Sequence, residues 1–133
     1  MNTRILKKKN CLITGATGGI GEEISKQLAT LSCNLFLTST NKTKLEKLKK
    51  NLRKINTSIT IETFPVNLDS EENVLELIKH VRKKFASINI LINCAGIFMI
   101  KSIEKSTIED FDKSINLNVK VPFILSREFS KDM

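Results

Sequence analysis

Short apolar segments alternate along the chain with longer stretches in which apolar residues recur every three or four positions. The first apolar segment is 11–13, and the second lies within 34–38. A third segment, 59–64, alternates apolar and polar residues, whereas 88–92 is nearly all apolar. Short apolar runs predict buried strands, and alternation predicts an outer strand with one exposed face. The pattern therefore predicts four strands, the third of them an outer one.

A helical periodicity follows each predicted strand. The apolar stripes of the first three helices are Ile20, Ile24 and Leu28, then Leu45, Leu48, Leu52 and Ile55, then Val74, Ile78, Val81 and Phe85. Asp69 and Glu72 have the spacing of a capping pair for the third helix. Ser106 and Glu109 have the spacing of a capping box for a last long helix, which continues to about Lys131. The chain is thus predicted to alternate strand and helix four times.

This alternation predicts a parallel sheet, because each helix returns the chain to the end of the sheet where the next strand begins. With right-handed crossovers the four strands lie in the order 3-2-1-4. We therefore predict an α/β fold with a doubly wound parallel sheet. No internal repeat, linker or low-complexity segment divides residues 1–133. They are expected to form a single domain, with a ligand crossing the carboxyl ends of the first and fourth strands.

Composition narrows the class of protein. Hydrophobic residues make up 41% of the chain, and no apolar run approaches the roughly 18 residues that a membrane span needs. Residues 1–10 are basic, but no apolar segment of a secretory signal follows them. The three cysteines, Cys11, Cys33 and Cys94, fall at no metal-ligand spacing. We expect a cytoplasmic protein with reduced thiols, no metal site and no membrane partner.

The formal net charge of +8 is compatible with nucleic-acid binding, because lysine-rich surfaces attract phosphate. Against that function, most of the lysines fall on the polar faces of predicted helices, and few aromatic residues are present to stack on bases. Solvated helix faces explain the charge better. We therefore predict no nucleic-acid partner.

The turn between the first strand and the first helix is rich in glycine and reads Thr14-Gly15-Ala16-Thr17-Gly18-Gly19-Ile20-Gly21. Glycine is needed where the backbone takes positive φ and where a phosphate approaches it closely. The first turn of the helix then offers free N–H groups to the anion. The turn is predicted to bind a pyrophosphate; the alternative is a glycine-rich turn without a ligand. The predicted cofactor-binding residues are Gly15, Ala16, Thr17, Gly18, Gly19, Ile20 and Gly21.

The spacing of this turn, T-G-x-x-x-G-I-G, resembles that of the short-chain dehydrogenase/reductase family. These are oxidoreductases with a Rossmann fold, and the chain is most similar in look to the 3-oxoacyl-acyl carrier protein reductases of bacterial fatty-acid synthesis. The resemblance implies reduction of a small-molecule or acyl-carrier-bound carbonyl. It also implies a homo-oligomer in the full-length form.

The loop after the second predicted strand bears on the choice of cofactor. An acidic residue there would bind the ribose 2′-OH of NAD, but 38–42 contains three hydroxyl residues and a lysine and no acid. We therefore predict NADP(H) as cofactor. The resemblance places Thr40 in contact with it. Gly18 departs from the family, because many NADP-using members carry arginine there, and the alternative is a polar loop that only caps the next helix.

Two further motifs of the resemblance follow the third and fourth predicted strands. Asn67-Leu68 stands where many family members have an aspartate that binds the adenine amino group, and an asparagine carbonyl can accept the same hydrogen bond. Asn93-Cys94-Ala95-Gly96 resembles the N-N-A-G motif, with Cys94 in place of its second asparagine. Small residues there let the backbone pass close to the nicotinamide ribose. The predicted contacts are Asn67, Leu68, Asn93, Cys94, Ala95 and Gly96.

Asn118 is the predicted catalytic residue of this part of the chain. Helical spacing places it on one face with Phe111, so it is expected to point toward the core, whereas Asn116 is turned away. Pro122 has no N–H to give the carbonyl of residue 118. The resemblance implies that this asparagine binds a water of the proton relay through its main chain. The alternative is a structural asparagine at a kinked helix.

The serine, tyrosine and lysine that carry catalysis in the family lie beyond the last predicted helix, and this chain contains no tyrosine. We expect the amino-terminal half of a reductase, a Rossmann domain incomplete at its carboxyl end and truncated after the fourth crossover helix. Alone it should be inactive, and the exposed edge of its fourth strand should favour self-association. The alternative function is a non-catalytic nucleotide-binding or dimerisation module from a truncated or split gene.

Overall fold

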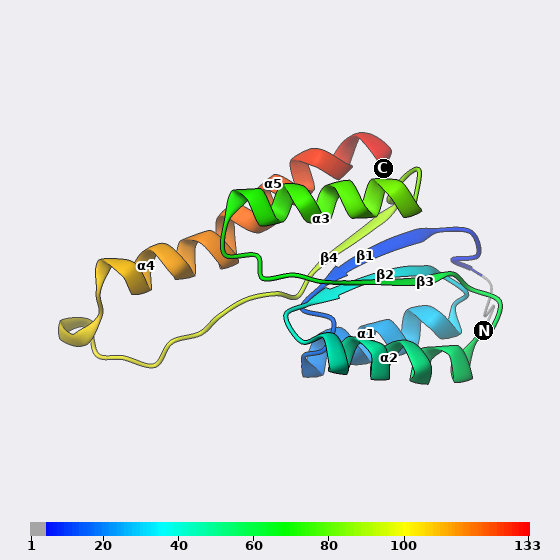
Figure 1. Cartoon of the computed structure of the whole chain (residues 1–133), viewed down its shortest axis with the longest axis horizontal. Helices are drawn as coiled ribbons and strands as arrows, with labels where there is room; N and C mark the ends of the chain where they lie inside the picture. Colours follow the sequence, from blue (N-terminus) through cyan, green and yellow to red (C-terminus); the bar gives the residue numbers. More distant parts are fainter. Residues whose placement is uncertain (1–4) are drawn as a thin grey trace.

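The computed structural model describes residues 5–133, which fold around one parallel sheet (Figure 1). Its strands are β1 (Asn10–Thr14), β2 (Asn34–Ser39), β3 (Ile61–Pro65) and β4 (Ile90–Asn93). They are hydrogen-bonded in the order β3-β2-β1-β4, and every neighbouring pair is parallel. The predicted Rossmann-type strand order is confirmed.

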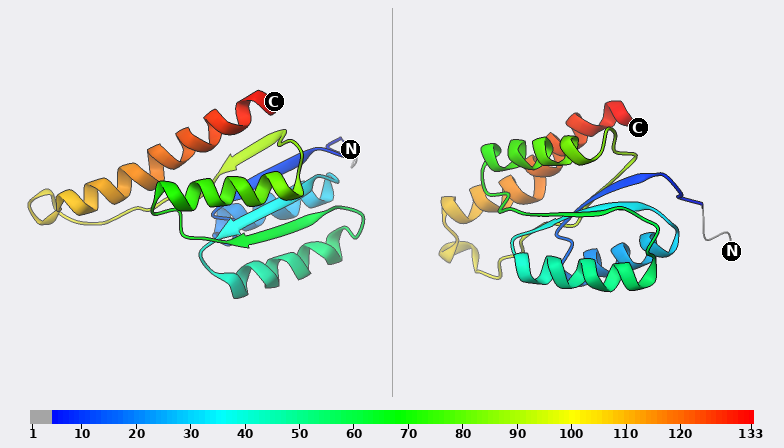
Figure 2. Two further views of the ribbon diagram at one scale, coloured as in Figure 1. Left: turned by 45° about the horizontal axis from the view of Figure 1, so that its top comes forward. Right: turned by 45° about the vertical axis from the view of Figure 1, so that its right-hand side comes forward.

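Helices cover both faces of the sheet, as Figures 1 and 2 show. On one face lie α1 (Gly19–Thr30) and α2 (Lys42–Ile55), and on the other α3 (Glu71–Lys84) and α5 (Val121–Phe129). Side chains alternate along a strand, so the central strands β1 and β2 bury apolar residues on both sides. Leu12 and Phe36 pack beneath α3 and α5, whereas Ile13 packs beneath α1 and α2.

Helix starts differ in detail from the predictions. The N-cap of α3 is Ser70, whose hydroxyl accepts from the Asn73 N–H, and not Asp69. The last helical segment begins with α4 (Ile108–Ile115) behind a capping box of Thr107 and Asp110, one residue after the predicted pair. Both shifts have one cause, because an N-cap needs an extended backbone at the residue where the chain turns into the helix, and spacing alone does not locate it.

Two residues of the predicted apolar stripes lie outside the core. Ile20 is 73% exposed and Ile55 is 45% exposed. Each stands at an end of its helix, beyond the part that packs on the sheet. The inner members of the stripes of α2 and α3, Leu45, Leu48, Leu52, Val74 and Val81, are buried as predicted.

A π-helical turn, Asn116–Lys120, joins α4 to α5, and a 3₁₀ turn, Ser130–Asp132, follows α5. In the π-turn the Val121 N–H donates to the Asn116 carbonyl, five residues back. The wider turn lies directly before Pro122, which cannot donate to a carbonyl of the preceding turn. The orientation predicted for Asn118 is wrong, because the helix face that carries it is exposed both before and after this turn: Phe111 is 60% exposed and Phe123 is 61% exposed. Asn118 is exposed with them, and Asn116 instead donates to the Leu68 carbonyl at 3.0 Å.

Asparagines fix the amino ends of the strands to one another. The Asn10 side chain donates to the Ser87 carbonyl at 3.0 Å and accepts from the Asn34 amide at 3.0 Å. The Asn10 N–H donates to the Asn89 side chain, and the Asn34 side-chain oxygen accepts from Thr60 at the start of β3. This asparagine belt links the entries of all the described strands.

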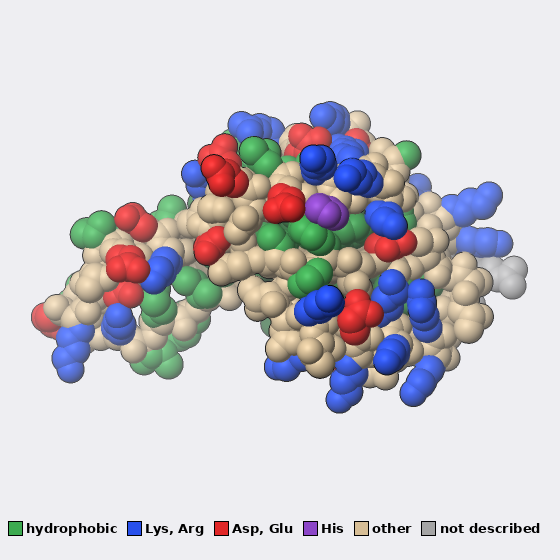
Figure 3. Space-filling model, viewed as in Figure 1, with side chains coloured by type: hydrophobic (Ala, Val, Ile, Leu, Met, Phe, Trp, Pro, Cys, Tyr) green, Lys and Arg blue, Asp and Glu red, His purple; other side chains and the backbone are tan. Residues whose placement is uncertain are grey.

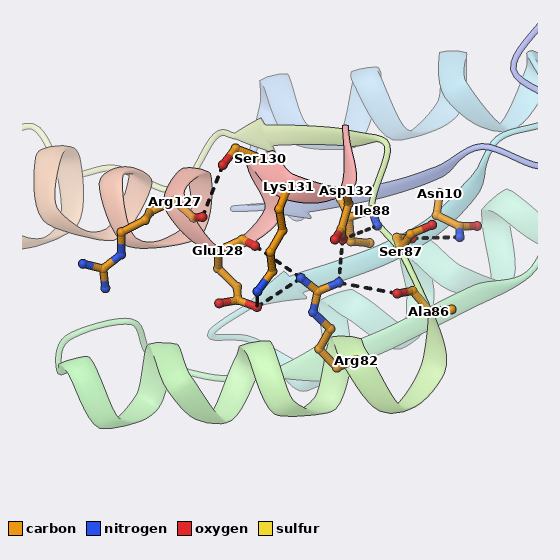
Figure 4. Close-up of polar contacts among 10 residues, drawn as sticks. All are labelled: Asn10, Arg82, Ala86, Ser87, Ile88, Arg127, Glu128, Ser130, Lys131 and Asp132. Carbon is orange, nitrogen blue, oxygen red and sulfur yellow. Dashed lines mark hydrogen bonds and ion pairs between the residues drawn. The ribbon is translucent and has the colours of Figure 1, made fainter.

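An ionic cluster around Arg82 fastens the end of the chain to α3 (Figure 4). The guanidinium pairs with Asp132 at 2.5 Å and with Glu128 at 3.0 Å, and its carbon lies 4.6 Å above the centre of the Phe129 ring. Asp132 also accepts the Ile88 N–H at 2.9 Å, just before β4. The cluster therefore ties α3, the last turn and the entry of β4 together.

Residues 97–115 form an arm that extends away from the sheet (Figures 1 and 2). It consists of a loop with a 3₁₀ turn, Ile103–Lys105, and of α4. Several of its large apolar side chains are exposed, Phe98 and Ile100 to 90%. Across residues 5–133, no helix combines the length and the apolar character that a bilayer crossing requires.

Candidate functional site

A cavity of about 370 Å³ opens at the carboxyl ends of the strands. Its walls come from the loops that follow β1, β2, β3 and β4, so segments distant in sequence meet there. Among the described lining residues none is charged, and hydroxyl, amide and backbone groups supply the polarity. The lining residues are Gly15, Thr17, Gly18, Thr38, Ser39, Thr40, Val66, Asn67, Leu68, Cys94, Ala95, Gly96, Ile97 and Leu117.

Two glycines of the first turn are required by its geometry. Gly15 has φ +62°, and a Cβ there would lie 2.6 Å from the Ala95 nitrogen. A Cβ at Gly21 would collide with the Gly15 carbonyl oxygen. By contrast, Gly19 has open space around the position of a Cβ. The turn thus has no side chain at the two positions where its backbone meets the end of β4 and where α1 starts against β1.

The amino terminus of α1 differs from those of the other described helices that begin in a loop. Side chains cap α2, α3 and α4, through Asn41, Ser70 and Thr107. The N-cap of α1 is Gly18, which has no side chain to offer. Because Thr17 and Gly18 line the cavity, the uncapped end of α1 faces it. The first N–H groups of a helix carry partial positive charge, and an anion in the cavity can take the place of a cap.

The end of β2 supplies hydroxyl groups to the same cavity. Thr17 donates a hydrogen bond to the Ser39 hydroxyl at 3.0 Å, and Ser39 also accepts the Asn41 N–H at 3.2 Å. Thr38 is buried and donates to the Phe64 carbonyl at 2.7 Å, so it holds β3 in place. Thr40 is exposed on the lining. Ser39 and Thr40 are therefore the hydroxyls that a ligand can reach.

Asn67 is fixed by its neighbours in an orientation that leaves an acceptor for a ligand. Its amide nitrogen donates to Asp69 at 3.1 Å, and its backbone carbonyl accepts from Asn73 at 2.8 Å. Asn67 lines the cavity, and its side-chain oxygen takes part in neither of these two contacts. Leu68 beside it is almost fully buried. An amide oxygen held over an apolar wall suits a flat ring that carries an amino group.

The loop after β4 approaches the first turn closely. The Ala95 N–H donates to the Thr14 hydroxyl at 3.1 Å. One residue further, the Ile97 N–H donates to the Asn118 side-chain oxygen at 2.9 Å, and the Asn118 amide donates to the Ile97 carbonyl at 2.8 Å. This two-bond pair holds the Asn118 side chain against the loop. The main-chain carbonyl of Asn118, which Pro122 cannot supply with an N–H, can act on a ligand or a water.

The sequence profile of the short chain dehydrogenase family matches residues 9–133. The chain belongs to the short-chain dehydrogenase family. It is 38% identical over 128 residues to the 3-oxoacyl-acyl-carrier-protein reductase of Rickettsia conorii, an alignment that covers 96% of this chain and 49% of that protein. The chain spans about half the length of the curated relatives it matches.

Solved structures agree with this family assignment. The L-sorbose reductase of Gluconobacter frateurii, in complex with NADPH and L-sorbose, superposes with a TM-score of 0.92 at 23% identity, over 100% of this chain and 50% of that one. A short-chain dehydrogenase of Sphingobium yanoikuyae, in complex with NADPH, gives 0.82 at 28% identity over 90% and 46% of the two chains. The fold of this short-chain dehydrogenase chain is that of the family's first half.

Most of the predicted cofactor residues of this family member lie together on the cavity wall. The exceptions are Asn93, which is exposed at the end of β4, Ala16 in the turn, and Gly19, Ile20 and Gly21, which form the start of α1. Asn118 lines a separate hollow under the arm. The prediction missed Val66, Ile97 and Leu117, because an apolar residue just beyond a motif carries no chemical signal of its own.

Few ionisable side chains lie at the described site. Burial raises the pKa of the Cys11 thiol strongly and that of Cys33 to about 11, so both stay protonated at neutral pH. Both are core residues, and neither lines the cavity. Within residues 5–133, no three His, Cys, Asp or Glu side chains gather as a metal site would require. What the described site can do is bind and orient a ligand.

Proposed function

We propose that this chain is the cofactor-binding half of an NADPH-dependent short-chain oxidoreductase, which reduces a 3-oxoacyl thioester or a similar carbonyl in the cytoplasm for fatty-acid synthesis. The observation that carries the proposal is the joint geometry of Gly15 and α1. The backbone at Gly15 is bare and the helix end beside it is uncapped, on the wall of a cavity at the carboxyl ends of parallel strands.

The lining offers a binding group for each part of an adenine dinucleotide. The pyrophosphate would lie at Gly15, Thr17 and Gly18, against the start of α1. The adenine amino group would donate to Asn67, over Leu68, and the nicotinamide ribose would lie along 94–96. No acid ends β2, and the hydroxyls of Ser39 and Thr40 suit a 2′-phosphate. When bound, NADPH would supply the hydride.

Relatives support the choice of reaction and cofactor. The Rickettsia conorii protein is named a 3-oxoacyl-acyl-carrier-protein reductase, and the Sphingobium yanoikuyae structure contains NADPH. Carbonyl reduction also needs a proton donor, and the chain contains no tyrosine. We therefore assign nucleotide binding, and not turnover, to the chain by itself. Asn118 would contribute through its main-chain carbonyl, which Pro122 leaves without one of its usual helical donors.

A nucleotide titration tests the proposal. The purified chain is titrated with NADPH and with NADH, and binding is followed by nucleotide fluorescence. We expect NADPH to bind more tightly, and Gly15→Val to abolish binding, because its Cβ would occupy the space against Ala95. Circular dichroism checks that the variant is folded.

A second variant tests the cofactor choice without touching the turn. Thr40→Asp adds an acid to the exposed end of the β2 loop. It should weaken NADPH binding at least about tenfold through like-charge repulsion and leave NADH binding intact. Tighter binding of NADH than of NADPH by the unmodified chain would refute the assignment of the cofactor.

The exposed apolar side chains of the arm favour a second candidate, a non-catalytic nucleotide-binding or dimerisation module. Phe98, Ile100 and Phe111 would then pack against a second copy and give a homo-oligomer. Sedimentation of the unmodified chain and of Phe98→Ser at several concentrations tests this candidate. Association that rises with concentration and is lost in Phe98→Ser supports packing through the arm, whereas association that Phe98→Ser leaves unchanged indicates pairing at the exposed edge of β4. A monomer at every concentration would rule this candidate out.

A further inference from the structure

A second, smaller cavity of about 220 Å³ lies between α1 and α2, and two lysines line it. We propose that this cavity receives the 2′-phosphate of NADPH, with Lys44 and Lys47 as its counter-charges. The inference rests on the function proposed above and names residues of the cofactor site that the motifs do not contain.

The two cavities meet at Thr17. Its side chain belongs to both linings and donates to the Ser39 hydroxyl at 3.0 Å. A ribose placed beside Ser39 and Thr40 in the larger cavity therefore lies next to the mouth of the smaller one. The smaller cavity is lined by Thr17, Glu22, Lys44, Lys47, Leu48 and Asn51.

Positive charge is concentrated in the smaller cavity. The described walls of the larger cavity contain no lysine or arginine. Lys44 and Lys47 make no ion pair within residues 5–133, and the one carboxylate of the smaller cavity, Glu22, is already paired with Lys26 at 2.8 Å. Lys44 and Lys47 are therefore available to a ligand, whereas the described lining of the larger cavity supplies no cation.

The backbone holds Lys44 at this place. Its N–H donates to the Asn41 cap at 2.9 Å, in the first turn of α2. Gly18, in the wall of the adjoining larger cavity, has no side chain to compete for a phosphate. A 2′-phosphate carries about two negative charges, which NADH lacks. Lysines placed beside the ribose 2′ position would therefore favour NADPH over NADH.

The outer face of α2 is lysine-rich as a whole, and Figure 3 shows basic side chains gathered over it. Position on the helix separates a binding lysine from a merely solvated one. Lys50 is exposed, like Lys44 and Lys47, and likewise makes no ion pair among the described residues, but it does not line the cavity. Lys50→Gln is therefore the matched control, with the same change of charge on the same helix.

The experiment measures the dissociation constants of NADPH and NADH for the chain, for Lys44→Gln, Lys47→Gln and the double variant, and for Lys50→Gln. Each cavity variant should weaken NADPH binding about fivefold, because an exposed ion pair contributes up to about 1 kcal/mol, and the double variant about 25-fold. NADH binding should be unchanged in all of them. Lys50→Gln should bind both nucleotides as the unmodified chain does.

The outcomes separate this inference from the proposed function. If the unmodified chain prefers NADPH and the two cavity variants match Lys50→Gln, the cavity does not hold the 2′-phosphate, and only this inference is overturned. Equal loss of NADH binding in the cavity variants also overturns it, because the lysines would then act on the shared part of the cofactor. If the unmodified chain binds neither nucleotide, the proposed function fails and this inference fails with it.

Discussion

The sheet and the arm are both rich in apolar side chains, but the sheet buries them and the arm leaves them exposed. Phe36, in the centre of β2, is 1% exposed and packs beneath α3 and α5. Phe98 in the arm is 90% exposed, and Phe111 is 60% exposed. An apolar pattern thus tells which side chains require a partner, but the position of that partner depends on how the whole chain is folded.

The two regions also differ in how they are held. The sheet is fixed by backbone hydrogen bonds along its strands and by the asparagine belt. The arm is held at its base by the pair between Asn118 and Ile97, and internally by Lys101 and Asp110 at 2.6 Å. Exposed charge pairs of that kind add little stability, so the arm should respond weakly to most substitutions.

The largest expected contrast is between two phenylalanines. Phe36→Ala should lower the free energy of unfolding by about 4 kcal/mol, because it leaves a cavity in the core. Phe111→Ala should change it by less than about 0.5 kcal/mol, since the ring is largely exposed. Urea unfolding followed by circular dichroism measures both. A similar loss for Phe111→Ala would show that the arm is packed in solution.

A smaller effect is expected from the ionic cluster that closes the sheet. The hydrogen bond from Arg82, and then that from the Ile88 N–H, hold the pKa of Asp132 below its usual value. Asp132→Asn should lower the free energy of unfolding by about 2 kcal/mol at pH 7. A pKa lowered by folding gives stability above the unfolded pKa, near 4, which is lost as the pH falls through the folded pKa.

The difference between the unmodified chain and Asp132→Asn should therefore shrink below about pH 4. Unfolding curves at several pH values measure it. Glu109 serves as the control in the arm, because its pKa is also lowered, by a hydrogen bond from Lys113, but both side chains of this pair are largely exposed. Glu109→Gln should leave the unfolding midpoint unchanged at every pH. A difference for Asp132→Asn that does not vary with pH would rule out the ionic explanation.

The smallest effect is expected at the base of the arm. Asn118→Ala removes both hydrogen bonds to Ile97 and should lower the free energy of unfolding by about 1 kcal/mol. Hydrogen exchange of the Ile97 N–H should become faster. Asn118→Asp keeps the acceptor for that N–H and should preserve its protection. If Asn118→Asp exchanges as fast as Asn118→Ala, the pair does not hold the loop.

The local sequence pattern was sufficient to predict the sheet and the glycine-rich turn. Strand order followed from alternating strands and helices with right-handed crossovers, and the demand for a bare backbone at Gly15 followed from its place between strand and helix. These features depend on short-range sequence and on general rules of chain topology. Gly21 could be predicted for the same reason.

What could not be predicted depends on contacts between distant segments. The helix face that carries Asn118 lies against the loop after β4 and not against the core, so Asn118 contacts Ile97. Lys44 and Lys47 looked like ordinary members of a basic helix face until the packing of α1 on α2 set them around a cavity. In each case the deciding information was a relation between two elements, which periodicity within one element does not contain.

The asparagine belt has a consequence for how the two ends of the sheet can change over evolution. The side chains of Asn10 and Asn34 hold the strands in mutual alignment where they begin, at the end of the sheet opposite to the loops that line the cavity. Those loops are then free to vary in length and chemistry while the strands keep their places. Because the belt fixes the strands at their amino ends, substitutions in the loops at their carboxyl ends can change what the cavity binds while the sheet is kept.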